Sequence, residues 1–193
     1  MNGELWWLGV KIVVLTSVAC LLVRFFARVP FADLGLRRWS RWSPTEKHFL
    51  PQITAITLAV FAFAASSQIS ELRGRHDLSR ILVFICVPQV VWGFHQEFVY
   101  RGMLQTELAR RWGGWRPILV SNLIFTFGPL HAYHFGLARH HPAHSWIFAA
   151  IFAIGLYFAI VYKRSRNLWI VGILHGIGDW FIDGLDIVAG MPR

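Results

Sequence analysis

Long apolar stretches separated by short charged segments run through the whole chain. Each stretch is close to the roughly 20 residues that a helix needs to cross the hydrocarbon core of a bilayer. The pattern therefore predicts an all-α, polytopic helical membrane protein with about six transmembrane helices. The predicted spans cover residues 5–26, 51–69, 81–108, 118–134, 146–162 and 168–189.

Proline and glycine predict where these spans begin, bend or loosen. Pro51 suits the first turn of the second span. The third span is longer than one crossing needs and contains Pro88 and Gly93, so we expect it to be tilted or kinked. Gly128 and Pro129 should loosen the backbone hydrogen bonding near the end of the fourth span.

Composition agrees with a membrane protein, because 55% of the 193 residues are hydrophobic and 10 are Trp. The net charge of +9 also occurs in nucleic-acid-binding proteins. Here most Lys and Arg lie between the apolar stretches, where they determine membrane topology. We therefore expect one membrane domain over residues 1–193, with the lipid bilayer and no nucleic acid as partner. The positive-inside rule places segments 24–47, 110–116 and 163–166 in the cytoplasm and both termini outside.

Ionisable side chains stand inside three of the apolar stretches. An ionisable residue at membrane depth costs about 2.5–3.5 kcal/mol on insertion scales, so it persists where it is paired or functional. Glu97 and Arg101 lie four residues apart in WGFHQEFVYRGMLQ, a spacing that places them on one helical face. His175 and Asp179 have the same spacing in the sixth span, and His131 lies in the fourth.

These side chains have the chemistry of a hydrolytic site. A carboxylate can act as general base, histidines can position water and stabilise an oxyanion, and Asp179 can orient His175. We expect the three clusters to meet in the inner half of the bilayer. A structural interpretation remains open, in which Glu97 and Arg101 form a buried ion pair that fixes helix packing and the histidines only pack or hydrogen-bond.

The motifs, taken in order along the chain, resemble a known family. A Glu pair followed by xxxR, then FxxxH, then HxxxN or HxxxD is the pattern of the CAAX protease and bacteriocin-processing family, also called the Abi family. Its members are glutamate-type intramembrane endopeptidases. The resemblance runs from Arg80 to Ala189, so residues 80–190 are the expected catalytic helical core and residues 1–79 are flanking spans.

The resemblance implies roles for individual residues. It implies that a glutamate and the first histidine activate a water, that the third motif forms an oxyanion site, and that no cofactor is needed. The implied catalytic residues are Glu97, His131, His175 and Asp179, and the implied supporting residues are Gln96, Arg101 and Phe127.

One position departs from the family pattern. Gln96 stands where the first Glu of the pair is expected, and that carboxylate is usually assigned the role of base. Glutamine cannot accept a proton from water. Either Glu97 serves as the base in this chain, or the chain is a catalytically silenced relative.

The leading prediction is an endopeptidase that cuts a membrane-anchored protein or peptide, by CAAX-type or C-terminal sorting-signal processing. The resemblance implies a multi-pass protein of the bacterial inner membrane. Two alternatives stay open: a silenced relative that acts as an immunity or binding protein, and a zinc-dependent membrane hydrolase. The expected zinc ligands in the second case are Glu97, His131, His175 and Asp179.

Overall fold

The computed structural model describes residues 3–21, 24–25, 29–72, 78–81 and 85–185. Every regular element in these ranges is a helix, which confirms the all-α fold class for the described residues. The segments Pro44–Ala64 and Pro142–Ser165 are long and apolar enough to cross a membrane, and Val10–Leu21 is a shorter apolar helix. Two of the six predicted spans are therefore supported by their length and composition.

Helix α2 (Pro44–Ala64) begins earlier than the sequence pattern predicts, and a capping box determines where. The hydroxyl of Ser43 accepts a hydrogen bond from the N–H of Glu46, and the Glu46 carboxylate accepts one from the N–H of Ser43. This reciprocal pair satisfies backbone donors that the first helical turn leaves open. The prediction that Pro51 lies in the first turn is wrong, since Pro44 takes that position and Pro51 lies inside the helix.

From Val87 onward, the third predicted span consists of three consecutive helical segments. Helix α5 (Val87–Glu97) continues into a π-helical segment, η5 (Phe98–Gln105), and then into α6 (Thr106–Arg111). Pro88 lies in the first turn of α5. The irregularity of this span is thus the π-helical segment that begins directly after Glu97, and π-helical turns are frequent at functional sites.

The other elements complete a helical bundle. The break expected at Gly128 and Pro129 is present, because α7 ends at Phe127 and a short 3-10 turn follows it. The helix that follows this turn runs to His140. The elements not yet given are α1 (Gly3–Leu21), α3 (Ser66–Leu72), α4 (Leu78–Ile81), α7 (Arg116–Phe127), η6 (Pro129–His131), α8 (Ala132–His140), η7 (Pro142–Ser145), α9 (Trp146–Ser165), α10 (Leu168–Asp179) and η8 (Trp180–Gly184).

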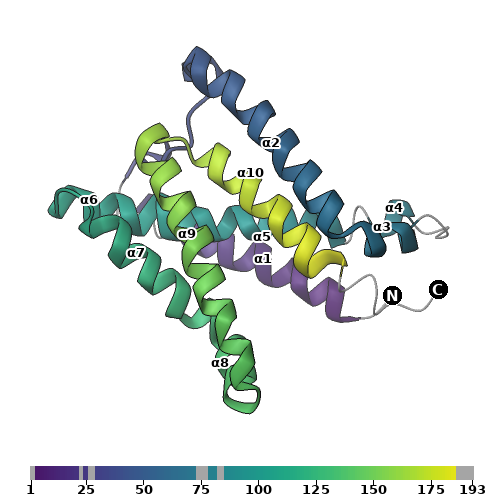
Figure 1. Cartoon of the computed structure of the whole chain (residues 1–193). Coiled ribbons are helices and arrows are strands. Elements are labelled where there is room, and N and C mark those ends of the chain that lie inside the picture. Colours follow the sequence, from purple (N-terminus) through teal and green to yellow (C-terminus); the bar gives the residue numbers. More distant parts are fainter. Residues whose placement is uncertain (1–2, 22–23, 26–28, 73–77, 82–84, 186–193) are drawn as a thin grey trace.

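Helices α5 and α10 cross at very short distance in the centre of the bundle. Helix α10 lies against α5, with α2 packed on α10 and α1 packed on α5 (Figure 1). A Cβ atom added to Gly93 would lie 2.6 Å from the backbone nitrogen of Gly176, so the crossing needs glycine at this point. Small residues at helix crossings allow this kind of close backbone approach in membrane proteins. The crossing brings the C-terminal end of α5 beside the middle of α10.

We expect Gly176→Ala to separate these two helices. A Cβ atom at this position would lie 2.6 Å from the carbonyl oxygen of Val90, and overpacking of this kind costs about 1–3 kcal/mol. Gly178→Ala is the matched control on the same helix, because its Cβ atom would meet only the Phe61 ring at 3.8 Å. Thermal unfolding in detergent should show a lower midpoint for Gly176→Ala alone. Equal midpoints for the two variants would contradict the close crossing.

Large apolar side chains cover the outer faces of the first two long helices. Val13 and Val14 of α1 are 64% and 53% exposed, and Phe63 of α2 is 86% exposed. Soluble proteins rarely expose large contiguous apolar surfaces, whereas lipid chains solvate them. These faces are therefore suited to contact with lipid.

Candidate active site

Arg101 joins three segments of the bundle through a fully buried ion pair. Its Nε donates to Glu97 Oε2 at 3.2 Å, and its Nη2 donates to Asn122 Oδ1 at 3.2 Å and to the Gly155 carbonyl at 3.0 Å. The side chains of Glu97 and Arg101 are both 0% exposed. These contacts tie η5 to α7 and α9, as the structural interpretation of the pair expects.

His175 lies between two carboxylates. Its Nδ1 is 2.8 Å from Glu97 Oε1, and its Nε2 is 3.4 Å from Asp179 Oδ1. An imidazole that faces carboxylates at both nitrogens is suited to the imidazolium form, which donates from both. That Asp179 orients His175 remains a prediction, for which the two side chains are close enough. The contact with Glu97 across the α5 and α10 crossing was not predicted, because it joins residues 78 positions apart.

The orientation of His131 is fixed by a proline. Its Nδ1 donates to the Phe125 carbonyl at 2.8 Å, since a carbonyl can only accept. In a continuous helix this carbonyl would accept from the N–H of residue 129, but Pro129 has none. The free carbonyl therefore holds His131, and the Nε2 of the neutral ring remains as the nitrogen that can accept a proton.

The ring of Phe125 lies between the two histidines. Its centroid is 4.9 Å from that of His131 and 5.8 Å from that of His175, with both imidazoles nearly perpendicular to it. The guanidinium of Arg101 lies 5.0 Å from the same ring centroid. Sequence reasoning missed Phe125. The sequence signal for it is Pro129, four residues later, because a proline has no N–H to donate to the Phe125 carbonyl.

Phe127 lies away from this cluster. It is 50% exposed and packs against Phe135 and Phe148. The aromatic ring that lies against the histidines is that of Phe125, two residues earlier. Residues two apart in a helix point about 200° away from each other, so Phe127 points outward when Phe125 faces the histidines.

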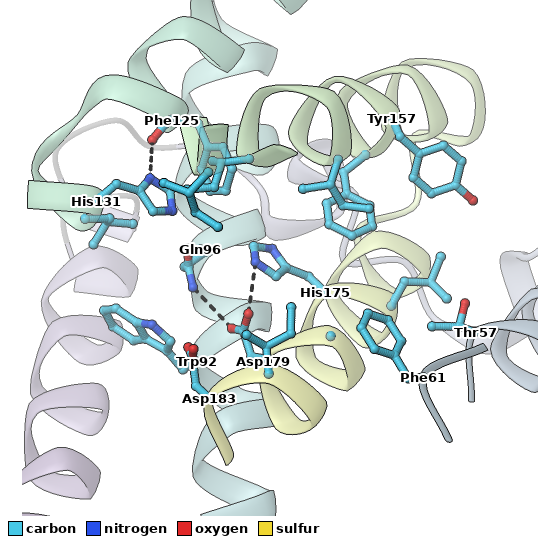
Figure 2. A pocket seen from close by; sticks show the side chains of 18 of the residues that line it. Thr57, Phe61, Trp92, Gln96, Phe125, His131, Tyr157, His175, Asp179 and Asp183 are labelled. Atoms are coloured by element: carbon cyan, nitrogen blue, oxygen red, sulfur yellow. Dashed lines mark hydrogen bonds and ion pairs between the residues drawn. The ribbon is translucent and has the colours of Figure 1, made fainter. Parts of the chain in front are cut away.

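Gln96 and Asp179 are in direct contact. The Gln96 amide nitrogen donates to Asp179 Oδ2 at 3.2 Å, and the Gln96 side chain is largely buried. Figure 2 shows Gln96, His131, His175 and Asp179 converging from three segments of the chain. Asp179 thus has one oxygen facing His175 and the other facing Gln96.

A cavity of about 670 Å³ opens onto this cluster. Its walls are mostly apolar, with a few polar groups that converge at one side, which is typical of ligand and substrate sites. Glu97 and Arg101 do not line it, although both are adjacent to residues that do. The polar lining residues are Thr57, Gln96, His131, Tyr133, His134, Tyr157, His175, Asp179 and Asp183, and the apolar ones include Ile56, Val60, Phe61, Trp92, Leu130, Ile151 and Leu174.

The zinc alternative predicts a cluster of ligands. Within the described ranges, no group of three or more His, Cys, Asp or Glu side chains has the geometry of a metal site. His134 and His144 form a pair outside the central cluster, with Nδ1 and Nε2 3.3 Å apart.

The arrangement defines a class of protein. Imidazole, carboxylate and amide groups that converge on an apolar cavity inside a helical bundle are suited to hydrolysis within a membrane. The chain belongs to the type II CAAX prenyl endopeptidase Rce1-like family, whose model matches residues 77–181, somewhat over half of the 193 residues. The match confirms the family resemblance drawn from the motifs and indicates a membrane protease. Comparisons with curated proteins and with solved structures gave no match.

Proposed function

We propose that this protein is an intramembrane endopeptidase that hydrolyses a peptide bond in a membrane-associated protein or peptide. The observation that carries the proposal is the convergence of His131, His175, Gln96 and Asp179 on one apolar cavity. Membership of a prenyl endopeptidase family supports the same chemistry. The proposed reaction uses no metal and no cofactor.

The reaction needs a base, a donor for the oxyanion and a proton for the leaving amine. A water bound near Nε2 of His131 attacks the carbonyl carbon of the substrate and gives its proton to the base. The carbonyl oxygen becomes an oxyanion, which N–H donors in the cavity stabilise. The C–N bond then breaks as the proton passes to the amine. That Glu97 is the base remains a prediction; its contacts also suit it to hold His175 in position.

The proposed setting is the bacterial inner membrane, crossed by about six helices, with the basic segments in the cytoplasm. Two helical segments with the length and composition of spans support this setting, as do the exposed apolar faces of α1 and α2. The proposed partners are the bilayer and a membrane-anchored substrate with a CAAX-type or sorting-signal C-terminus. Nucleic acid is not a proposed partner.

Cleavage can be measured in membranes that contain the protein, with tagged membrane-anchored substrates that end in CAAX-type or sorting-signal sequences. We expect mass spectrometry to find a new C-terminus only where the protein is present. Because the proposed reaction uses no metal, a strong zinc chelator should leave the rate unchanged. Loss of cleavage with the chelator and recovery with zinc would favour the zinc alternative. If none of these substrates were cut, the result would contradict the proposed activity.

One observation favours a second candidate function. Gln96 occupies a cavity position at which the family motif has a carboxylate, and an amide there cannot act as a base. In this second candidate, the protein binds a membrane peptide or partner protein without cutting it. The wild type would then retain tagged peptide in a pull-down from membranes, while Gln96→Glu would be the form that cuts.

A further inference from the structure

Two carboxylates flank His175, and their accessibility differs. Glu97 is 0% exposed, its two oxygens face Arg101 Nε and His175 Nδ1, and it does not line the cavity. A water that approached Glu97 from the cavity would have to displace His175. Asp179 lies on the cavity wall and its side chain is 14% exposed. Of this pair, Asp179 is therefore the carboxylate that a substrate water can reach.

Asp179 also has capacity to hold such a water. An ionised carboxylate offers about four acceptor positions. The contacts with His175 and Gln96 use one position on each oxygen, so each oxygen of this cavity-lining side chain keeps a further acceptor position. His131 lines the same cavity from the other side of the Phe125 ring, and Nε2 is the ring nitrogen that its contact with the Phe125 carbonyl leaves available. A water between these groups would have two acceptors that together fix its orientation.

Gln96 can donate a hydrogen bond, whereas Asp179 can accept one. Its amide nitrogen carries two hydrogens, and the contact with Asp179 Oδ2 uses one of them. The second can donate to an oxygen in the cavity. A buried amide that is fixed in position by a neighbouring carboxylate has the character of an oxyanion-hole donor.

Resting on the proposed function, we infer that Asp179 is the carboxylate base of this enzyme and that Gln96 donates to the oxyanion. Compared with the family motif, which has a carboxylate at the position of Gln96 and permits an amide at that of Asp179, the two groups have exchanged places. Water attacks the carbonyl carbon, and its proton passes to Asp179. The resulting oxyanion accepts from Gln96. When the C–N bond breaks, Asp179 returns the proton to the amine, which leaves a carboxylic acid and an amine as products.

The test is a four-member set: wild type, Asp179→Asn, Gln96→Glu, and the double variant that carries both changes. Asp179→Asn removes the base, so kcat should fall at least about 100-fold. Gln96→Glu places two carboxylates in contact and removes the amide, so it should also lose activity. The double variant again pairs one carboxylate with one amide, and we expect it to recover to within about tenfold of the wild type. Such strong non-additivity is the signature of a directly coupled pair.

Melting midpoints in detergent show whether a variant that loses activity is still folded. Asp179→Asn can keep a hydrogen bond with Gln96, so its melting midpoint should remain close to that of the wild type. Three results would overturn the inference while the proposed function stands: full activity of Asp179→Asn, a double variant no more active than Asp179→Asn, or loss of folding that accounts for every loss of activity. An inactive wild type with an active Gln96→Glu would overturn both, and so would a set in which no member cuts any substrate.

Discussion

His131→Asn should abolish peptide cleavage while the protein remains folded. The asparagine amide nitrogen can occupy the position of Nδ1 and donate to the Phe125 carbonyl, so the contact that fixes the end of α7 is retained. The group that the variant lacks is Nε2, the ring nitrogen that remains to accept a hydrogen bond from the attacking water in the proposed reaction. Loss of a group that positions a reactant can lower kcat by about 10²-fold.

The measurement is single-turnover cleavage of a tagged substrate in detergent micelles, with the melting midpoint recorded on the same samples. His140→Asn is the matched control, because His140 is an exposed residue at the end of α8. We expect its rate to equal that of the wild type. If His131→Asn cuts at the rate of His140→Asn, the imidazole has only a structural role.

Arg101→Met should cause the largest loss of stability of any single substitution proposed for this chain. It removes the contacts that join η5 to α7 and α9, and it leaves the buried Glu97 carboxylate without its guanidinium partner. Removing one member of a buried ion pair costs about 3–5 kcal/mol, because the remaining charge stays in a low-dielectric environment. Unfolding in a denaturing detergent measures this difference.

The chain offers a matched control with the same spacing. Arg111 and Glu107 also lie four residues apart and are 2.8 Å from each other, but their side chains are 70% and 48% exposed. Exposed pairs contribute little, so Arg111→Met should change the free energy of unfolding by less than about 0.5 kcal/mol. Adding Glu97→Gln to Arg101→Met removes the unpaired charge and should restore part of the stability. If Arg101→Met and Arg111→Met lowered the free energy of unfolding by the same amount, the buried pair would contribute no more to stability than the exposed pair.

The variants at His131 and Arg101 distinguish catalytic from structural residues, which the sequence alone did not separate. Arg101 and Glu97 are fully buried and link helices, whereas His131 and Asp179 lie on the cavity wall. Substitutions in the first group should act on stability before activity. Substitutions in the second group should act on activity while the fold is kept.

The sequence by itself determined the helical class, the polar clusters and the family. These features depend on local properties: the length of an apolar stretch, the cost of a charge inside it and the spacing of residues within one helix. The i to i+4 pairs, Glu97 with Arg101 and His175 with Asp179, were predicted on this basis and are in contact. The apolar pattern predicted the start of α2 at Pro51, whereas the capping box at Ser43 starts the helix at Pro44.

Only the tertiary structure decided which polar side chains face the cavity. Gln96 and Glu97 are adjacent in sequence, but neighbouring residues of a helix point about 100° apart, so one faces the cavity and the other the helix interface. The glycine crossing of α5 and α10 sets that rotation, through backbone contacts between residues far apart in the chain. In the same way, the rotation of α7 turns Phe125 rather than Phe127 toward the histidines. Residue spacing within one span contains no information about the rotation of that span against its neighbours, and this is the physical reason that the contact between Gln96 and Asp179 became visible only in the folded chain.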